Sequence, residues 1–136
     1  MICNLCPRRC GAERLPDRAG GVCAMPSLPV AARAMLHQWE EPCLVGEHGA
    51  GAVFFSGCNL RCKFCQNGII SQVGFGKTIS TERLREIFRE LVEQGAACLD
   101  LVTPTHFADA VLEALGEERW PVPVVWNCGG YESVET

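Results

Sequence analysis

The segment from Cys58 to Cys65 carries three cysteines at C-x3-C-x2-C spacing, directly after the apolar run 52–55. Three thiolates are one fewer than the ligands that complete a tetrahedral zinc site or fill every position of a four-iron cluster. A four-iron cluster held by Cys58, Cys62 and Cys65 would keep one iron free to bind another molecule. The spacing therefore predicts an iron–sulfur site with an open coordination position.

The same spacing also fits one face of a helix, because the three positions are i, i+4 and i+7. On a helix the cysteines would act as small apolar side chains. Gly57 and Gly68 flank the segment, however, and Asn59 and Asn67 favour turns. We therefore favour a loop in which the three thiolates can approach one point.

A second group of cysteines occupies the N-terminal region at C-x2-C-x3-C-x12-C spacing: Cys3, Cys6, Cys10 and Cys23. Four thiols with glycines between them are typical of a closed metal site that holds zinc or an iron–sulfur cluster. The alternative is a set of reduced cysteines packed in a loop-rich segment. We favour a metal because so short a polar segment has few other means of ordering. Residues 1–27 are thus predicted to form a Cys-rich metal-binding module.

The composition is that of one modest domain. The 136 residues carry a net charge of −4 with both signs interspersed, which gives no indication of a nucleic-acid surface. We expect the basic group formed by Arg8, Arg9, Arg14 and Arg18 to be a solvated face. No apolar run approaches the ~18 residues of a membrane span. Ten cysteines without an N-terminal apolar leader favour metal ligation in a reducing cytoplasm over disulfides.

The apolar pattern predicts strands that alternate with helices. Strands are expected at 52–56, 98–103 and 122–126, with helices at about 81–94 and 106–115, the second capped by Thr105. Residues 28–36 alternate weakly, and their Ala and Met content fits a helix equally well. The order of elements calls for right-handed crossovers and a parallel sheet, as in the first half of an α/β barrel.

The catalytic and ligand-binding residues of such a barrel lie on the loops that follow the strand C-termini. The three predicted loops carry the cysteines 58–65, then Thr103 to His106, then Asn127 to Tyr131. Gly129 and Gly130 would allow a backbone to approach a ligand closely, or would form a turn. All three loops carry residues that could bind a ligand or take part in catalysis. This coincidence is stronger evidence for a site than any one of the loops.

Glu40 and Glu41 form a pair of carboxylates before Pro42, with His37 three residues before Glu40. Paired carboxylates can do acid–base work. Adjacent residues of an extended chain point to opposite sides, so at most one of the two can face a site. We expect a solvated or structural role for the pair.

The cysteine motif, with the aromatic Phe64 before its last cysteine, resembles the signature of radical S-adenosylmethionine (radical SAM) enzymes. Further segments follow one another in an order similar to that of pyruvate formate-lyase activating enzyme-like proteins: 3–10, 37–42, 54–57, 65–67, 102–106 and 127–133. The resemblance covers nearly the whole chain. It implies an incomplete parallel (β/α) barrel with its first three strands, in which residues 28–136 are the N-terminal part of a barrel truncated at the C-terminus.

The resemblance also implies cofactors and their ligands. Cys58, Cys62 and Cys65 would bind a [4Fe–4S] cluster whose remaining iron takes the amino and carboxylate groups of SAM. The residues expected around SAM are Phe64, Thr103, Asn127, Gly129 and Gly130. The second loop departs from the wider pattern, because many relatives carry Gly-Gly-Glu where this chain has Val102-Thr103-Pro104. Ordinary packing beneath the cluster is the alternative for Phe64. His106 is open as a ligand, a base or a surface residue, and we favour no special role.

By resemblance, the reaction is reductive cleavage of SAM followed by hydrogen abstraction from a substrate. One outcome would be a glycyl radical on a protein partner. The implied partners are an electron donor such as flavodoxin or ferredoxin and a protein substrate, without nucleic acid or membrane. The competing hypothesis is a non-catalytic module in which the cysteine groups hold structural zinc or iron–sulfur. No motif in the sequence identifies the substrate.

Overall fold

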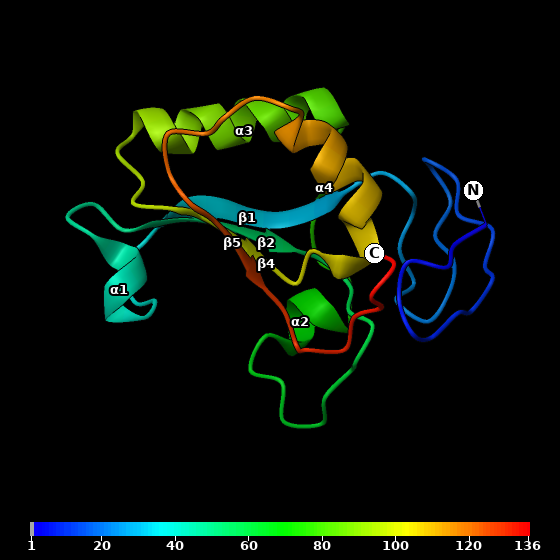
Figure 1. Ribbon diagram of the computed structural model, residues 1–136. Coiled ribbons are helices and arrows are strands. Elements are labelled where there is room, and N and C mark those ends of the chain that lie inside the picture. Colours follow the sequence, from blue (N-terminus) through cyan, green and yellow to red (C-terminus); the bar gives the residue numbers. More distant parts are fainter. Residues whose placement is uncertain (1) are drawn as a thin grey trace.

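The computed structural model describes residues 2–136, so the first residue of the predicted 1–27 module lies outside it. Within this part of the chain, the centre is a five-stranded sheet in the order β3-β1-β2-β4-β5 (Figure 1). The strands are β1 (Val30–His37), β2 (Ala50–Phe55), β3 (Lys77–Thr78), β4 (Leu99–Val102) and β5 (Val124–Asn127). The helices are α1 (Pro42–Val45), α2 (Gly68–Ser71), α3 (Thr81–Glu93) and α4 (Ala108–Leu115), with a 3-10 turn at Thr105–Phe107.

Three neighbouring strands confirm the predicted parallel α/β arrangement. β4 pairs in parallel with β2 on one side and with β5 on the other. The crossover helices α3 and α4 lie together on one face of the sheet (Figure 1). α3 begins where the sequence predicts, because the Ser80 side chain accepts a hydrogen bond from the Arg83 backbone N–H at 3.1 Å.

The sheet is not wholly parallel, which corrects the expectation from the sequence. β1 runs antiparallel to β2, and β3 pairs antiparallel with β1. Only the short α1 and its flanking turns connect β1 to β2, and an antiparallel neighbour needs no long crossover. The ambiguous segment 28–36 is therefore mostly strand rather than helix, and residues 2–136 form an open mixed sheet.

The start of the second long helix also differs from expectation. Thr105 does not cap α4, because Thr105–Phe107 form a 3-10 turn and Phe107 is the N-cap, without a side-chain capping hydrogen bond. The Thr105 hydroxyl instead donates to Glu132 Oε1 at 2.6 Å. A partner 27 residues away has replaced the local capping interaction.

The apolar core lies between the sheet and the two helices α3 and α4. Leu99 and Leu101 of β4 pack there with Phe55 of β2, and all three are at most 1% exposed. Alternate residues of a strand point to opposite faces, so Asp100 belongs to the other face. That second face, which we call the inner face, is bordered by α1, α2 and the loop between β2 and α2 (Figure 1).

The described helices have no membrane-spanning candidate. None of those within residues 2–136 is both long and apolar enough to cross a bilayer. This finding agrees with the absence of a long apolar run in the sequence.

Candidate functional site

The segment 57–67, which we call the thiol loop, leaves the C-terminal end of β2 and forms no helix, as its flanking residues predict (Figure 1). It begins at Gly57, whose φ of +80° lies in the left-handed region that favours glycine. A Cβ at Gly57 would lie 2.4 Å from Met25 Cγ and 3.0 Å from the Cys23 carbonyl oxygen. The start of the thiol loop therefore packs closely against the N-terminal module.

The donor chemistry of the thiol loop fits a cluster held by three thiolates. Cys58, Cys62 and Cys65 are free thiols and partly exposed. Cys58 Sγ accepts a hydrogen bond from the Leu60 backbone N–H at 3.3 Å, and Cys65 Sγ lies 3.3 Å from Ser71 Oγ. Such donors also surround the sulfurs of iron–sulfur clusters and tune them. Among residues 2–136, no three His, Cys, Asp or Glu side chains converge closely enough to hold a metal ion.

Contacts from the N-terminal module and the third loop fix the thiol loop. Arg8 Nε donates to the Asn59 carbonyl oxygen at 2.8 Å and Nη2 to that of Leu60 at 3.3 Å. The same guanidinium lies 5.5 Å from the centre of the Tyr131 ring. Asn59 Nδ2 donates to the Tyr131 carbonyl oxygen at 2.8 Å. Sequence patterns do not indicate these contacts, because the partners are 51 to 72 residues apart.

The residues expected around SAM in the second and third loops are brought together. The Thr103 backbone N–H donates to the Asn127 carbonyl oxygen at 2.8 Å. Gly129 lies against the thiol loop, since a Cβ there would be 2.2 Å from Leu60 Cδ1. Gly129 and Gly130 are both exposed. The loops after β2, β4 and β5 therefore meet at one edge of the sheet.

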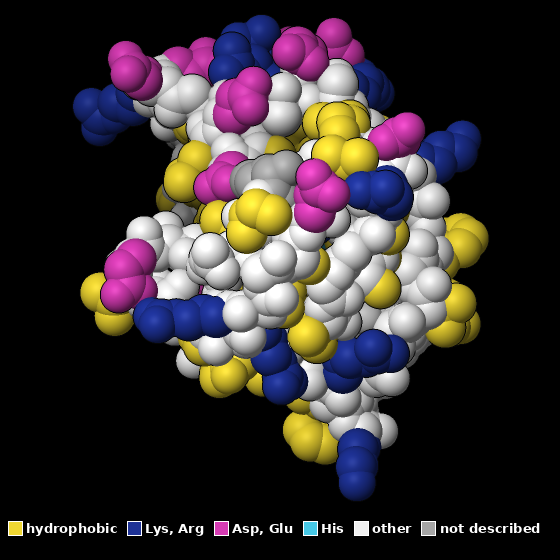
Figure 2. Space-filling view, turned by 90° about the vertical axis from the view of Figure 1, so that its right-hand side faces the viewer, with side chains coloured by type: hydrophobic (Ala, Val, Ile, Leu, Met, Phe, Trp, Pro, Cys, Tyr) yellow, Lys and Arg dark blue, Asp and Glu magenta, His cyan; other side chains and the backbone are white. Residues whose placement is uncertain are grey.

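Phe64 differs from the other expected residues because it contacts little protein. Its side chain is 90% exposed, so it packs against little of the described protein. Its neighbours Arg61 and Lys63 are exposed as well. In Figure 2, the charged side chains over the lower part of the face are mostly basic, whereas acidic and basic side chains alternate toward the top.

His106 is buried, so the surface alternative for this residue is wrong. It is 2% exposed, and Nε2 lies 2.6 Å from the Ser56 carbonyl oxygen. Because a carbonyl only accepts, Nε2 carries the hydrogen, and Nδ1 has no partner in residues 2–136. Burial lowers the pKa of His106 to about 4, and the Arg14 charge acts in the same direction. Neutral His106 therefore ties the second loop to Ser56, directly before the thiol loop.

Arg14 is 1% exposed, which corrects the expectation that it is solvated. Its Nη1 donates to the His106 carbonyl oxygen at 2.6 Å and lies 3.4 Å from Cys3 Sγ. Its Nε donates to the carbonyl oxygens of Met25 and Pro26, each at 3.1 Å. The guanidinium therefore links the N-terminal module to the second loop. The other three arginines of the basic group are exposed, as expected.

The four N-terminal cysteines differ in their surroundings. Cys3 and Cys6 are buried, Cys23 is partly exposed and Cys10 is exposed. Backbone N–H groups of Ala12 and Val22 lower the pKa of the Cys10 thiol, whereas burial raises the pKa of Cys23. The second metal site at these residues stays a prediction.

The inner face holds two carboxyl groups in close proximity. Asp100 is fully buried, and no donor in residues 2–136 forms a hydrogen bond to either of its oxygens. Burial raises the pKa of Asp100. Burial and the neighbouring Asp100 charge raise the pKa of Glu40 to about 7. His37 Nε2 lies 3.7 Å from Glu40 Oε1, and the Glu40 side chain is 15% exposed, so of the two roles expected for Glu40, solvated or structural, the solvated one does not hold.

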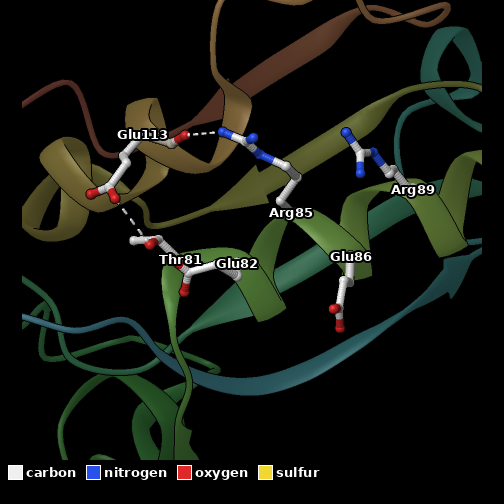
Figure 3. A pocket seen from close by; sticks show the side chains of 6 residues that line it. All are labelled: Thr81, Glu82, Arg85, Glu86, Arg89 and Glu113. Atoms are coloured by element: carbon white, nitrogen blue, oxygen red, sulfur yellow. Dashed lines mark hydrogen bonds between the residues drawn. The ribbon is translucent and has the colours of Figure 1, made fainter.

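A hollow of about 430 Å³ lies between α3 and α4 (Figure 3). Arg85 donates to the carbonyl oxygens of Glu113 at 2.6 Å and Ala114 at 2.9 Å. Thr81 Oγ1 donates to the Glu113 carboxylate at 3.2 Å. These side chains connect the two helices to each other, so we assign the hollow to helix packing rather than to a ligand.

Comparisons with known proteins agree with this arrangement. A family model described as the radical SAM superfamily matches residues 52–120, which begin within β2 and include the thiol loop, α3, β4 and α4. An uncharacterized protein of Methanocaldococcus jannaschii is 33% identical over 141 residues, which cover 98% of this chain and 40% of that protein. The chain thus spans two fifths of the length of this curated relative. No solved structure matches the chain.

Proposed function

Because the chain belongs to the radical SAM superfamily, we propose that Cys58, Cys62 and Cys65 hold its [4Fe–4S] cluster and leave one iron for SAM. Membership implies an enzyme of the radical SAM type, which uses such a cluster together with SAM. The matched region 52–120 contains one other cysteine, Cys98. Cys98, directly before β4, is 2% exposed, and burial raises the pKa of its thiol, which disfavours it as a ligand.

The observation that carries the proposal is the meeting of three loops at one sheet edge. The thiol loop follows β2, and the loops after its parallel neighbour β4 and after the next strand, β5, lie beside it. We propose that residues of these loops line the SAM site: Phe64, Thr103, Asn127, Gly129 and Gly130. Exposed glycines allow close backbone approach to a ligand. When bound, the reduced cluster supplies the electron that cleaves the sulfonium of SAM.

The finer function proposed is that of an activating enzyme-like protein. Such a protein abstracts hydrogen and can leave a glycyl radical on a protein partner. Support for this subfamily comes from the order of sequence segments that flank the cysteines. We propose a cytoplasmic setting and an acidic electron donor of the flavodoxin or ferredoxin kind. The exposed Arg61 and Lys63 of the thiol loop suit such a donor.

The proposal is tested by metal analysis after anaerobic purification and reconstitution with iron and sulfide. We expect about four iron atoms at the thiol loop. Cys58→Ala should remove them, whereas the matched control Cys98→Ala should retain them. Cys23→Ala should release only the N-terminal metal, which we propose to be zinc or a second iron–sulfur centre held by Cys3, Cys6, Cys10 and Cys23.

Two results would contradict the proposal. A colourless protein that holds only zinc in both cysteine groups would identify a structural module without radical chemistry. Loss of metal from both groups in Cys58→Ala would mean that the two groups form one shared centre.

A further inference from the structure

The inner face carries a cavity whose chemistry differs from that of the hollow between the helices. Its volume is about 430 Å³, and its lining includes Met35, His37, Trp39, Glu40 and Phe54. Trp39 is 90% exposed, and the His37 ring meets the Phe54 ring edge to face at 6.0 Å. Aromatic rings combined with a carboxylate are the groups with which proteins bind organic cations.

The second observation is the buried carboxyl of Asp100 next to Glu40. Asp100 is 0% exposed and accepts no hydrogen bond from any donor in residues 2–136. Two neighbouring carboxylates without a donor or a cation between them cannot both ionise at low cost. Burial raises the pKa of both carboxyl groups, and the Asn127 side chain only partly offsets this rise at Asp100. A cation in the cavity would favour the ionised form of the pair.

The charges around the pair favour a cation. Glu41 lines the cavity together with Glu40, Asp100 is buried beside them, and Arg33 contributes a positive charge to the same lining. The ion-pair partner of Glu40 is His37 rather than Arg33. Three carboxyl groups therefore stand against one permanent cation.

We propose that the inner-face cavity binds a protonated amine or guanidinium group of an organic ligand. Glu40 is the direct carboxylate partner, and Asp100 is the buried carboxyl beside it. Trp39 and Phe54 supply the aromatic surface. Binding of this ligand to the cavity needs neither the cluster nor SAM. The inference rests on the proposed function only for the additional step of taking this ligand to be the substrate.

The test is an NMR titration of cluster-free protein with n-butylammonium chloride. The indole N–H signal of Trp39, assigned with Trp39→Phe, reports occupancy of the cavity. We expect a saturable shift at pH 8 that requires about tenfold more ligand at pH 6, because the pKa of Glu40 near 7 leaves the pair protonated there. Sodium chloride at equal ionic strength and sodium butyrate are the ligand controls and should give no saturable shift.

Variants separate a binding role from a structural one. Glu40→Gln keeps the side-chain volume and should weaken butylammonium binding about tenfold or more. The matched control Glu93→Gln, on the exposed surface of α3, should bind as the unchanged protein does. Asp100→Asn should lower the pKa of Glu40 and move the pH dependence of binding to lower pH, because a like charge is removed.

Several results would overturn the inference. Butylammonium binding to Glu40→Gln as tight as to the unchanged protein would do so. A saturable shift of the Trp39 signal with Mn²⁺ but not with butylammonium would also do so. Circular dichroism checks that each variant is folded, and Glu40→Gln decides alone if Asp100→Asn unfolds. Cys58→Ala should leave butylammonium binding intact, so failure of the cluster assignment and failure of this inference are distinguishable.

Discussion

His106 is a base whose proton affinity differs between the folded and unfolded chain. Burial lowers its pKa to about 4 in the folded protein, against an ordinary value of 6.5. Between these values the unfolded chain binds a proton that the folded protein does not. The free energy of unfolding therefore falls as the pH falls from about 6.5 to 4, and the contribution of this residue is about 3 kcal/mol.

We expect His106→Gln to flatten the pH dependence of stability in this range. The Gln amide can donate to the Ser56 carbonyl oxygen but does not titrate. Urea unfolding at pH 4.5, 5.5 and 7 measures the effect, and His48→Gln on the exposed surface is the matched control. A pH dependence in His106→Gln equal to that of the control would show that the buried imidazole is not the titrating group.

Arg14, Asp100 and His106 show what the sequence alone does not reveal at this scale. Asp100 stands in a short apolar run, which predicts a strand but not the exclusion of its carboxyl from solvent. The contact of Arg14 with the His106 carbonyl spans 92 residues. A local pattern of basic residues predicts a solvated group, because it contains no information about a partner so distant.

The thiol loop is an element whose start depends on one glycine. Gly57→Ala would place a Cβ in contact with Met25 and the Cys23 carbonyl at a φ of +80°. We expect a loss of about 1–3 kcal/mol in the free energy of unfolding. Gly68→Ala, in the first turn of α2, has open space around the new methyl group and should be neutral or slightly stabilising. Thermal unfolding of both variants measures the difference, and equal stabilities would contradict the assigned role of Gly57.

A second prediction at this scale concerns the contact between the N-terminal module and the thiol loop. Arg8→Ala removes the donors to the Asn59 and Leu60 carbonyl oxygens. We expect amide hydrogen exchange at Leu60 to become about fivefold faster, which corresponds to the loss of about 1 kcal/mol of local stability. Arg9→Ala, at the next exposed arginine, is the matched control. Exchange that accelerates equally in both variants would mean that Arg8 does not anchor the loop.

The longer elements were predictable and the short ones were not. The apolar face of α3 and its Ser80 cap are local signals, so its position follows from the sequence. β3 has only two residues and exists because it pairs with β1. α1 and α2 have four residues each and depend on neighbouring segments for their form. Thr105 is of a residue type that often caps helices, but its hydroxyl donates a hydrogen bond to Glu132 instead.

At the scale of the whole molecule, the two faces of the sheet have different roles. One face packs against α3 and α4 around the apolar core, and the other carries the acidic pair and the inner-face cavity. The parallel order of β2, β4 and β5 was predictable from alternating strands and helices, and it brings the three loops to one edge. The antiparallel addition of β1 was not, because its Ala-rich sequence fits helix and strand alike.

The most direct test of the central claim is electron paramagnetic resonance of the reduced, reconstituted protein with and without SAM. If the cluster is held by Cys58, Cys62 and Cys65 with one iron free, SAM should bind that iron and change the spectrum. Methionine and 5′-deoxyadenosine should then accumulate, and Cys58→Ala should show neither effect. A reduced-cluster spectrum that SAM leaves unchanged, or a SAM-dependent spectral change that persists in Cys58→Ala, would contradict the account.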